Sequence, residues 1–201
     1  RQFLFRLREF EQMEMQYFVN PKDAPVLYEE WKGERMEYYN RLGIKKEKLR
    51  WKQHDNLVFY AKDAWDIQYQ YPFGWGELEG IHYRSDYDLN QHKKFSGVDT
   101  TYFDEETKEK YIPHVIETSV GVERTILMLL VDAYDEDEMS GEKRVVLRFK
   151  PNMSPIKVAV FPLLKNKPEL VEKAREIYKI LKKEFGAVVF DDNGNIGKRY
   201  R

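Results

Sequence analysis

The chain has 201 residues, of which 42% are hydrophobic and 34% charged, and its formal net charge at pH 7 is -1. This length and apolar content suffice for a packed core and predict a globular protein. Cysteine is absent, which excludes disulfides, cysteine-ligated zinc and thiol chemistry.

The first predicted element is a strand over residues 2–19, because bulky and charged side chains alternate there. One face is expected to pack against the core, and the other is expected to carry functional groups. The packing face would hold Phe3, Phe5, Leu7, Met13, Met15 and Tyr17, and the other face Arg6, Arg8, Phe10, Gln12 and Glu14.

A helix is predicted next, from about Ala24 to Leu42, since Pro25 suits a first helical turn and Gly43 a helix end. Alternating apolar and polar residues then indicate strands over residues 64–71 and 77–84. This part of the chain is therefore expected to mix a helix with sheet strands.

A short helix is predicted after Ser85, followed by a hairpin that joins residues 101–104 to residues 110–113. A strand over residues 114–119 then leads through a glycine into an apolar helix over residues 122–134. No apolar run approaches the eighteen or so residues of a membrane span, and the first residues lack a secretory-signal pattern. We therefore expect a soluble protein without membrane contact.

The elements predicted after residue 134 lead from the antiparallel part of the chain into a βαβ unit. The acidic residues 135–138 are expected to form a solvated loop, and residues 144–149 a strand. Residues 156–161, 168–185 and 187–190 are then predicted to form a strand, a helix and a second strand, a βαβ unit with a buried parallel pair. The sequence thus predicts an α+β fold, an antiparallel sheet flanked by helices followed by the start of an α/β domain.

Two domains are expected, over residues 1–150 and 155–201, and their charges differ. Residues 143–201 hold 15 Lys or Arg and 6 Asp or Glu, a balance of 15 - 6 = +9, so residues 1–142 carry -1 - 9 = -10. A basic second module is typical of nucleic-acid surfaces. The alternative is a set of solvated lysines on an amphipathic helix.

Three groups of residues are candidates for a site. Arg6, Phe10 and Glu14 are spaced four residues apart, and a strand would separate Phe10 from Glu14 by about 13 Å. A guanidinium binds phosphate, an aromatic ring covers a base, and a carboxylate holds an ammonium group, so the three suit an extended nucleotide conjugate. The alternative is a sheet surface of ordinary ion pairs.

The second group is the run ETSVGVER at residues 117–124. Glu117 and Ser119 would share a strand face, and Gly121 would let the backbone approach a ligand. Arg124 would lie in the first turn of the next helix, where the dipole also favours phosphate. The alternative is an ordinary strand-to-helix turn with a surface arginine.

The third group is the glycine- and aromatic-rich run FGWGELEGIHYRSDYDL at residues 73–89. Glu77 and Glu79 are expected to share a strand face, with Arg84 offset from them. Glu77 would suit a hard cation that bridges phosphates, because Mg²⁺ prefers carboxylate oxygens. The alternative is a glycine-kinked strand with exposed acids.

Together these groups resemble the class II aminoacyl-tRNA synthetases. The ordered motifs are R-x-x-x-F-x-x-x-E, GELEGI with R-x-D-Y-D-L, and E-x-S-x-G-x-x-R entering a helix. The runs REFEQME, PFGWGELEGI and GKRYR are similar to glycyl-tRNA synthetases of the α2 type. The resemblance covers essentially the whole chain.

The resemblance implies roles for individual residues, with Arg6 and Arg124 as the catalytic residues and Glu77 as a Mg²⁺ ligand. It implies that Phe10 stacks on adenine, that Glu14 binds the amino group of glycine, and that Arg84 supports the pocket. The implied ATP-binding residues are Phe5, Arg6, Leu7, Arg8, Glu9, Phe10, Glu77, Leu78, Gly121, Val122, Glu123 and Arg124. The implied substrate-binding residues are Phe10, Glu11, Gln12, Met13, Glu14, Arg84, Glu117, Thr118, Ser119, Val120 and Gly121.

The resemblance implies a glycine–tRNA ligase that uses ATP and Mg²⁺, takes glycine and tRNA(Gly) as substrates, and is a cytoplasmic homodimer. The family's other motifs would precede and follow this chain, so we expect part of a longer enzyme that is not fully active alone. Two other functions stay open: a class II synthetase for another amino acid, and a synthetase-like subunit without catalysis that binds nucleic acid or assists a polymerase.

Overall fold

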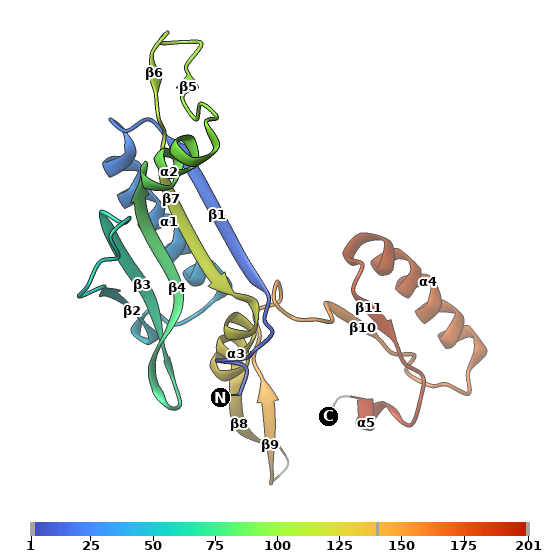
Figure 1. Cartoon of the computed structure of the whole chain (residues 1–201). Helices are drawn as coiled ribbons and strands as arrows, with labels where there is room; N and C mark the ends of the chain where they lie inside the picture. Colours follow the sequence, from blue (N-terminus) through green and yellow to red (C-terminus); the bar gives the residue numbers. More distant parts are fainter. Residues whose placement is uncertain (1–2, 140, 200–201) are drawn as a thin grey trace. The chain divides into compact units, whose positions relative to one another are not determined.

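A computed structural model describes residues 3–139 and 141–199, which form two compact units (Figure 1). The first unit extends to Arg148 and the second begins at Phe149. Residues 1–2, at the start of the predicted strand and first domain, and residues 200–201, at the end of the second predicted domain, lie outside the described residues.

The first unit is built on a five-stranded sheet in the order β1-β7-β4-β3-β2, in which each neighbouring pair is antiparallel. This confirms the predicted antiparallel sheet. Its strands are β1 (Gln12–Val19), β2 (Leu49–Gln53), β3 (Asp63–Tyr71), β4 (Gly74–Ser85) and β7 (His114–Gly121).

Helices and two small hairpins surround this sheet, and most match the predicted segments, whereas β2 and the short helix η1 were not predicted. The helices of the first unit are α1 (Ala24–Leu42), η1 (Lys46–Lys48), α2 (Tyr87–Ser96) and α3 (Val122–Ala133). The hairpins pair β5 (Tyr102–Phe103) with β6 (Lys110–Tyr111) and β8 (Tyr134–Met139) with β9 (Glu142–Leu147).

The acidic run at residues 135–138 is a strand, so the predicted solvated loop is wrong. Its residues lie within β8, and cations lie on β9 and directly after it. Arg144 donates to the Asp137 carboxylate, and Arg148 forms ion pairs with both Asp135 and Asp137. Cross-strand pairing of opposite charges therefore allows an acidic sequence to adopt a β-hairpin.

The predicted strand over residues 2–19 is also corrected, because β1 begins only at Gln12. Gln12 pairs with Gly121, the last residue of β7, and the chain then turns into α3, so β7 offers no further strand partner to the residues before Gln12. The Glu11 carbonyl accepts a hydrogen bond from the Val122 amide at 2.9 Å, which ties the preceding segment to the start of α3 instead.

The packing face predicted for this segment is likewise only partly realised. Phe5 is buried, whereas Phe3, Met13 and Tyr17 are 79%, 45% and 38% exposed. β1 is the edge strand of the sheet, and in the described part of the chain only its last residue, Val19, is buried. The alternation of β1 therefore does not correspond to a covered face within this chain.

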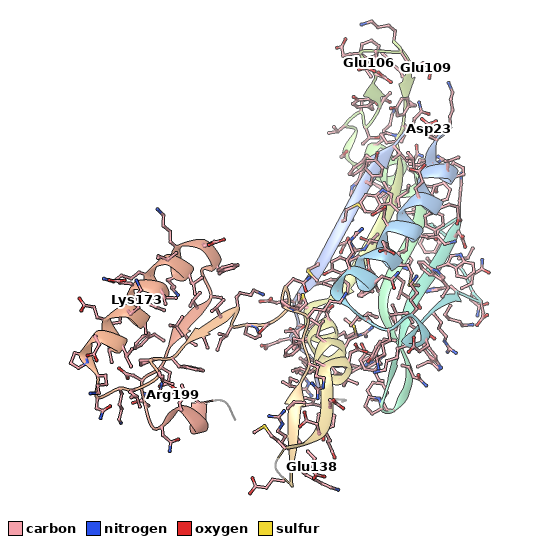
Figure 2. The ribbon with its side chains drawn as sticks, turned by 180° about the vertical axis from the view of Figure 1, so that it is seen from behind. Asp23, Glu106, Glu109, Glu138, Lys173 and Arg199 are labelled. Atoms are coloured by element: carbon pink, nitrogen blue, oxygen red, sulfur yellow. The ribbon has the colours of Figure 1, made fainter. Side chains whose placement is uncertain are left out.

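Helix α1 covers one face of the sheet, as Figure 2 shows. The Tyr28 hydroxyl donates to the Ile81 carbonyl at 3.0 Å. Glu79 is fully buried beneath the helix, where Arg35 Nε lies 2.6 Å from one carboxylate oxygen and the Tyr39 hydroxyl 2.5 Å from the other. Burial and the Glu79 charge hold the pKa of Tyr39 well above its usual value, so its hydroxyl stays a donor.

Glu77 and Glu79 lie on different sides of β4, so the prediction of a shared face is wrong. The register between β3 and β4 shifts here: Gln68 pairs with Glu77 and the preceding Ile67 pairs with Glu79. A β-bulge of this kind places an extra residue, here Leu78, in one strand and reverses the side-chain alternation. Glu79 therefore contacts α1, while Glu77 remains half exposed.

The second unit contains the predicted βαβ arrangement. Its elements are β10 (Val158–Val160), α4 (Pro168–Phe185), β11 (Val188–Phe190) and α5 (Ile196–Arg199), with β10 and β11 parallel. The buried core consists of Val160, Ala174 and Val188. Among the described residues of both units, no helix has the length and apolar character to cross a membrane.

Because the Glu79 charge is buried, removing its cationic partner Arg35 is expected to destabilise the fold. Arg35→Met leaves the Glu79 carboxylate buried with only Tyr39, and breaking a buried pair in this way costs about 3 kcal/mol of unfolding free energy. Chemical denaturation followed by circular dichroism measures it. Arg41→Met is the matched control on the same helix, because Arg41 and its partner Glu34 are exposed and should contribute less than about 1 kcal/mol. Equal losses in the two variants would contradict the assignment.

Candidate functional site

A cavity of about 190 Å³ lies where the N-terminal segment, β4, the end of β7 and the start of α3 meet. The segments are far apart in sequence, yet the cavity brings together many residues predicted for the nucleotide. Its lining consists of Leu4, Phe5, Arg6, Leu7, Phe10, Gln12, Glu77, Leu78, Ser119, Gly121, Glu123 and Arg124.

Arg124 connects three of the cavity walls. Its Nε donates to the Phe5 carbonyl at 3.0 Å, and its Nη1 donates to the Glu77 carbonyl at 3.1 Å. The same Nη1 lies 3.1 Å from the Glu77 carboxylate. The guanidinium also lies over the Phe5 ring, 4.6 Å from its centroid. One side chain in the first turn of α3 thus holds both the N-terminal segment and β4.

Phe5 forms the floor of this region rather than an exposed contact surface. Its ring packs edge-to-face on Tyr71 and Phe73, at centroid distances of 5.2 and 5.1 Å. A Cβ at Gly76 would lie 2.9 Å from the Phe5 ring, closer than real Cβ atoms come. Glycine at this position of β4 therefore allows the aromatic ring to reach the core.

The N-terminal segment has a second attachment to α3. Glu123 accepts hydrogen bonds from the Glu11 amide at 3.0 and 3.2 Å through its two carboxylate oxygens. Together with the Arg124 contacts, this fixes the segment at both ends, so Arg6 and Phe10 lie between two anchored points. Phe10 is 60% exposed, and its ring is accessible at the cavity edge.

A row of polar side chains continues from the cavity along β1 and β7. Glu14 pairs with Ser119 in the register of the two strands. Gln12 donates to both Ser119 and Glu14, and Gln16 donates to Glu14 at 2.8 Å and reaches Glu117 at 3.5 Å. The row is therefore linked to the cavity through Gln12 and Ser119, which belong to both.

Glu117 is the buried end of this row. Its carboxylate accepts a hydrogen bond from Arg84 Nη1 and lies 3.3 Å from His82 Nδ1. Arg84 Nη2 forms an ion pair with Asp88. Burial raises the pKa of Glu117, but the contacts with His82 and Arg84 outweigh it and hold the pKa below its ordinary value. Glu117 is thus a carboxylate at neutral pH.

The predicted site residues divide between these two regions and their surroundings. Arg6 and Phe10 line the cavity but do not belong to a strand with Glu14, so their spacing is not a strand repeat. Thr118 and Val120 are buried, on the opposite face of β7 from Ser119. The predicted residues outside the cavity lining are Arg8, Glu9, Glu11, Met13, Glu14, Arg84, Glu117, Thr118, Val120 and Val122.

Besides Leu4 of the cavity lining, two polar residues of this region were not predicted, His82 and Gln16. His82 follows Gly80 and precedes Arg84 at the period of two that places side chains on one strand face, so this signal was available. Gln16 has the same relation to Glu14 on β1. In both cases the partner, Glu117, comes from a distant part of the chain.

Comparison with known families decides the relationship of the chain. The model of the tRNA synthetase class II core domain (G, H, P, S and T) matches residues 2–133. The chain belongs to the class II tRNA synthetase family. The model of the anticodon binding domain matches residues 157–201 of this synthetase chain. Both matches agree with the resemblance drawn from the sequence motifs.

Curated relatives of this synthetase chain are named glycine–tRNA ligase. The relative from Chlorobaculum tepidum is 52% identical over 200 residues, which cover 99% of this chain and 42% of the relative. The relative from Treponema denticola is 49% identical over 209 residues, covering 100% and 46%. That from Caldanaerobacter subterraneus is 51% identical over 201 residues, covering 99% and 43%. The chain spans less than half the length of these relatives.

The lowered pKa of Glu117 predicts a pH-dependent contribution to stability. A carboxyl whose folded-state pKa lies below its ordinary 4.5 stabilises the fold above that pH, and the contribution is lost as pH falls through the folded-state pKa. Glu117→Gln is therefore expected to cost about 1.5–3 kcal/mol at pH 7 and progressively less in acid. Denaturation at a series of pH values measures this difference.

Glu109→Gln is the control for this measurement, because Glu109 pairs with Lys22 on the surface. Its effect should stay below about 1 kcal/mol at pH 7. A deficit for Glu117→Gln that stays constant between pH 7 and pH 3 would contradict the stabilising role of the ionised form.

Proposed function

We propose that this chain is the part of a glycine–tRNA ligase that binds ATP and glycine and carries the start of the anticodon-binding domain. The observation that carries the proposal is the connection between the cavity and the polar row through Gln12 and Ser119. A nucleotide in the cavity and an amino acid on the row would be neighbours, as formation of an aminoacyl-adenylate requires.

The cavity residues suit the nucleotide. Arg6 and Arg124 are cations at its wall, and Arg124 lies in the first turn of α3, where the helix dipole also favours phosphate. The exposed ring of Phe10 can cover a base. In the proposed reaction the glycine carboxylate attacks the α-phosphorus of ATP and pyrophosphate leaves, so these side chains act by alignment and charge neutralisation.

Glu77 is the proposed Mg²⁺ ligand, and its surroundings fit that role. Its carboxylate is 53% exposed at the cavity, and one oxygen faces Arg124. Within the described residues it belongs to no group of three side chains that could hold a metal. Mg²⁺ commonly binds one or two carboxylates together with phosphates and waters, so Glu77 would contribute one position beside the phosphates of ATP.

The polar row suits an amino acid without a side chain. Glu14 and Glu117 offer two carboxylates for the ammonium group, and Arg84 holds Glu117 in place. Glycine presents no side chain to recognise, so selection has to come from the grip on the ammonium group and from the lack of room for a methyl at Cα. The names of the curated relatives support glycine as the amino acid.

The second unit is the proposed contact with tRNA(Gly). Its residues 149–201 hold 12 Lys or Arg and 6 Asp or Glu, a balance of 12 - 6 = +6, and phosphate contacts supply much of nucleic-acid affinity. Lys165, Arg175 and Lys179 line a surface hollow at α4 together with Glu172 and Glu176. The match to an anticodon binding domain supports the same role. A homodimer and a cytoplasmic location complete the proposal and rest on the family resemblance alone.

Amino-acid-dependent pyrophosphate exchange by the full-length protein tests this function. Exchange is expected with glycine and ATP, and not with threonine, proline, histidine, serine or alanine. Exchange that depends on another amino acid would identify a synthetase of different specificity. Absence of exchange with every amino acid, in a protein that still binds tRNA, would favour a subunit without catalysis.

Replacing Glu14 separates glycine binding from ATP binding. Glu14→Gln in the full-length protein is expected to lower kcat/KM for glycine roughly 10- to 100-fold, because it removes a charge-assisted hydrogen bond to the ammonium group. The KM for ATP should change little. Pyrophosphate exchange at varied glycine and at varied ATP measures both, and equal losses would refute the assigned role.

Glu106→Gln is the control for the same assay. Glu106 lies in the turn between β5 and β6, at the tip of the hairpin at the top of Figure 2, and the residue is exposed. This variant removes one surface charge, and both kinetic constants should stay at the parent values.

A further inference from the structure

A cluster of metal-ligating side chains lies on the sheet, outside the cavity and apart from Glu77. It consists of His54, which follows β2, Asp66 of β3 and His82 of β4. One ligand atom from each of the three lies within 4.8 Å of the other two. The cluster thus draws on three consecutive elements of the sheet, and β2 and β4 both pair with β3.

One nitrogen of this cluster lacks a partner. His82 Nε2 is buried and accepts or donates no hydrogen bond among the described residues, whereas His54 Nε2 lies 2.8 Å from Asp66 Oδ1. A buried polar atom without a partner costs free energy, and native proteins seldom leave one without a reason. A hydrogen bond between His54 and Asp66 explains those two residues but not His82.

The other ring nitrogen of His82 prepares Nε2 for a cation. His82 Nδ1 lies 3.3 Å from the buried carboxylate of Glu117. A carboxylate favours the tautomer with a proton on Nδ1, which leaves the lone pair on Nε2. Metal-binding histidines in proteins commonly have this arrangement, with the second nitrogen donating to a carboxylate.

Gly80 keeps the space beside the cluster free. A Cβ at this position would lie 3.0 Å from His82 Nε2 and 3.7 Å from Asp66 Oδ1. A larger residue at position 80 would therefore crowd the His82 ring and would contact two of the three donor atoms. The backbone of β4 at this point thus leaves both donor atoms unobstructed.

We propose that His54, Asp66 and His82 bind a divalent transition metal of the zinc class. Two imidazoles and one carboxylate match the donors that Zn²⁺ prefers, and Mg²⁺ is disfavoured because it prefers oxygen ligands. Three protein ligands leave a fourth position for water or another small ligand. The side chains are 35%, 14% and 26% exposed, so solvent reaches the site.

The bound metal would have two consequences for the molecule. It would tie the segment after β2 to β3 and β4, and it would hold the His82 ring with Nδ1 toward Glu117. This site is distinct from the proposed Mg²⁺ position at Glu77, and it does not require the proposed ligase activity. Metal binding at this cluster and glycine-dependent pyrophosphate exchange can therefore each be found or fail without the other.

Cobalt spectroscopy on the full-length protein, freed of metal with a chelator, tests the proposal. Co²⁺ is expected to give the visible absorption of a four- or five-coordinate site, and Zn²⁺ should displace it, whereas Mg²⁺ should not. Asp66→Asn and His82→Gln are each expected to weaken Co²⁺ affinity at least about tenfold, since even outer partners of a metal ligand contribute that much. Absence of the bands in the parent protein would overturn the proposal.

His92→Gln is the matched control, because His92 is an exposed histidine on α2 and lies outside the cluster. Its Co²⁺ affinity should equal that of the parent. Bands retained in both Asp66→Asn and His82→Gln, or lost in His92→Gln, would place the metal elsewhere and overturn the proposal. Thermal unfolding of each metal-free variant verifies the fold. If one cluster variant does not fold, His54→Gln replaces it under the same expectation.

Discussion

The contacts of Arg124 hold the candidate site together. This side chain begins in the first turn of α3, donates to backbone carbonyls of Phe5 and Glu77, and covers the Phe5 ring. The three residues come from parts of the chain that share no secondary structure element. The cavity exists because they converge on one guanidinium, whose planar group can donate in several directions at once. Its charge is also available to a phosphate.

The two faces of the sheet serve different purposes. One face is closed by α1, and its buried charge, Glu79, is fully satisfied by Arg35 and Tyr39. The other face keeps Glu14 and Glu117 in a linked polar row. The bulge in β4 separates these environments, because it turns neighbouring acids to opposite sides. A rigid, packed face thus supports a polar face that can exchange its hydrogen bonds with a ligand.

Electrostatics connect the proposed glycine row with the proposed metal cluster. His82 contacts Glu117 through one nitrogen and approaches Asp66 and His54 through the other. Glu117 stays ionised because Arg84 and His82 compensate its burial. A cation in the cluster would therefore change the strength of the hydrogen bond between His82 and Glu117. Glu117 is one of the two carboxylates that we propose bind the ammonium group of glycine. Both sites would share one histidine ring and one strand, β4.

Local pattern in the sequence was sufficient for the main helices and strands, for the βαβ unit and, through ordered motifs, for the family. The periodicity of helices and strands depends only on residues that are neighbours in the chain, and the family is recognised from the order of its motifs along the chain. The tertiary structure alone decided where β1 begins, because β7 ends at Gly121, and it alone separated Glu77 from Glu79 by a register shift. It also made the acidic residues 135–138 a strand and brought His54, Asp66 and His82 together. These features depend on partners distant in the chain, and no local spacing encodes them.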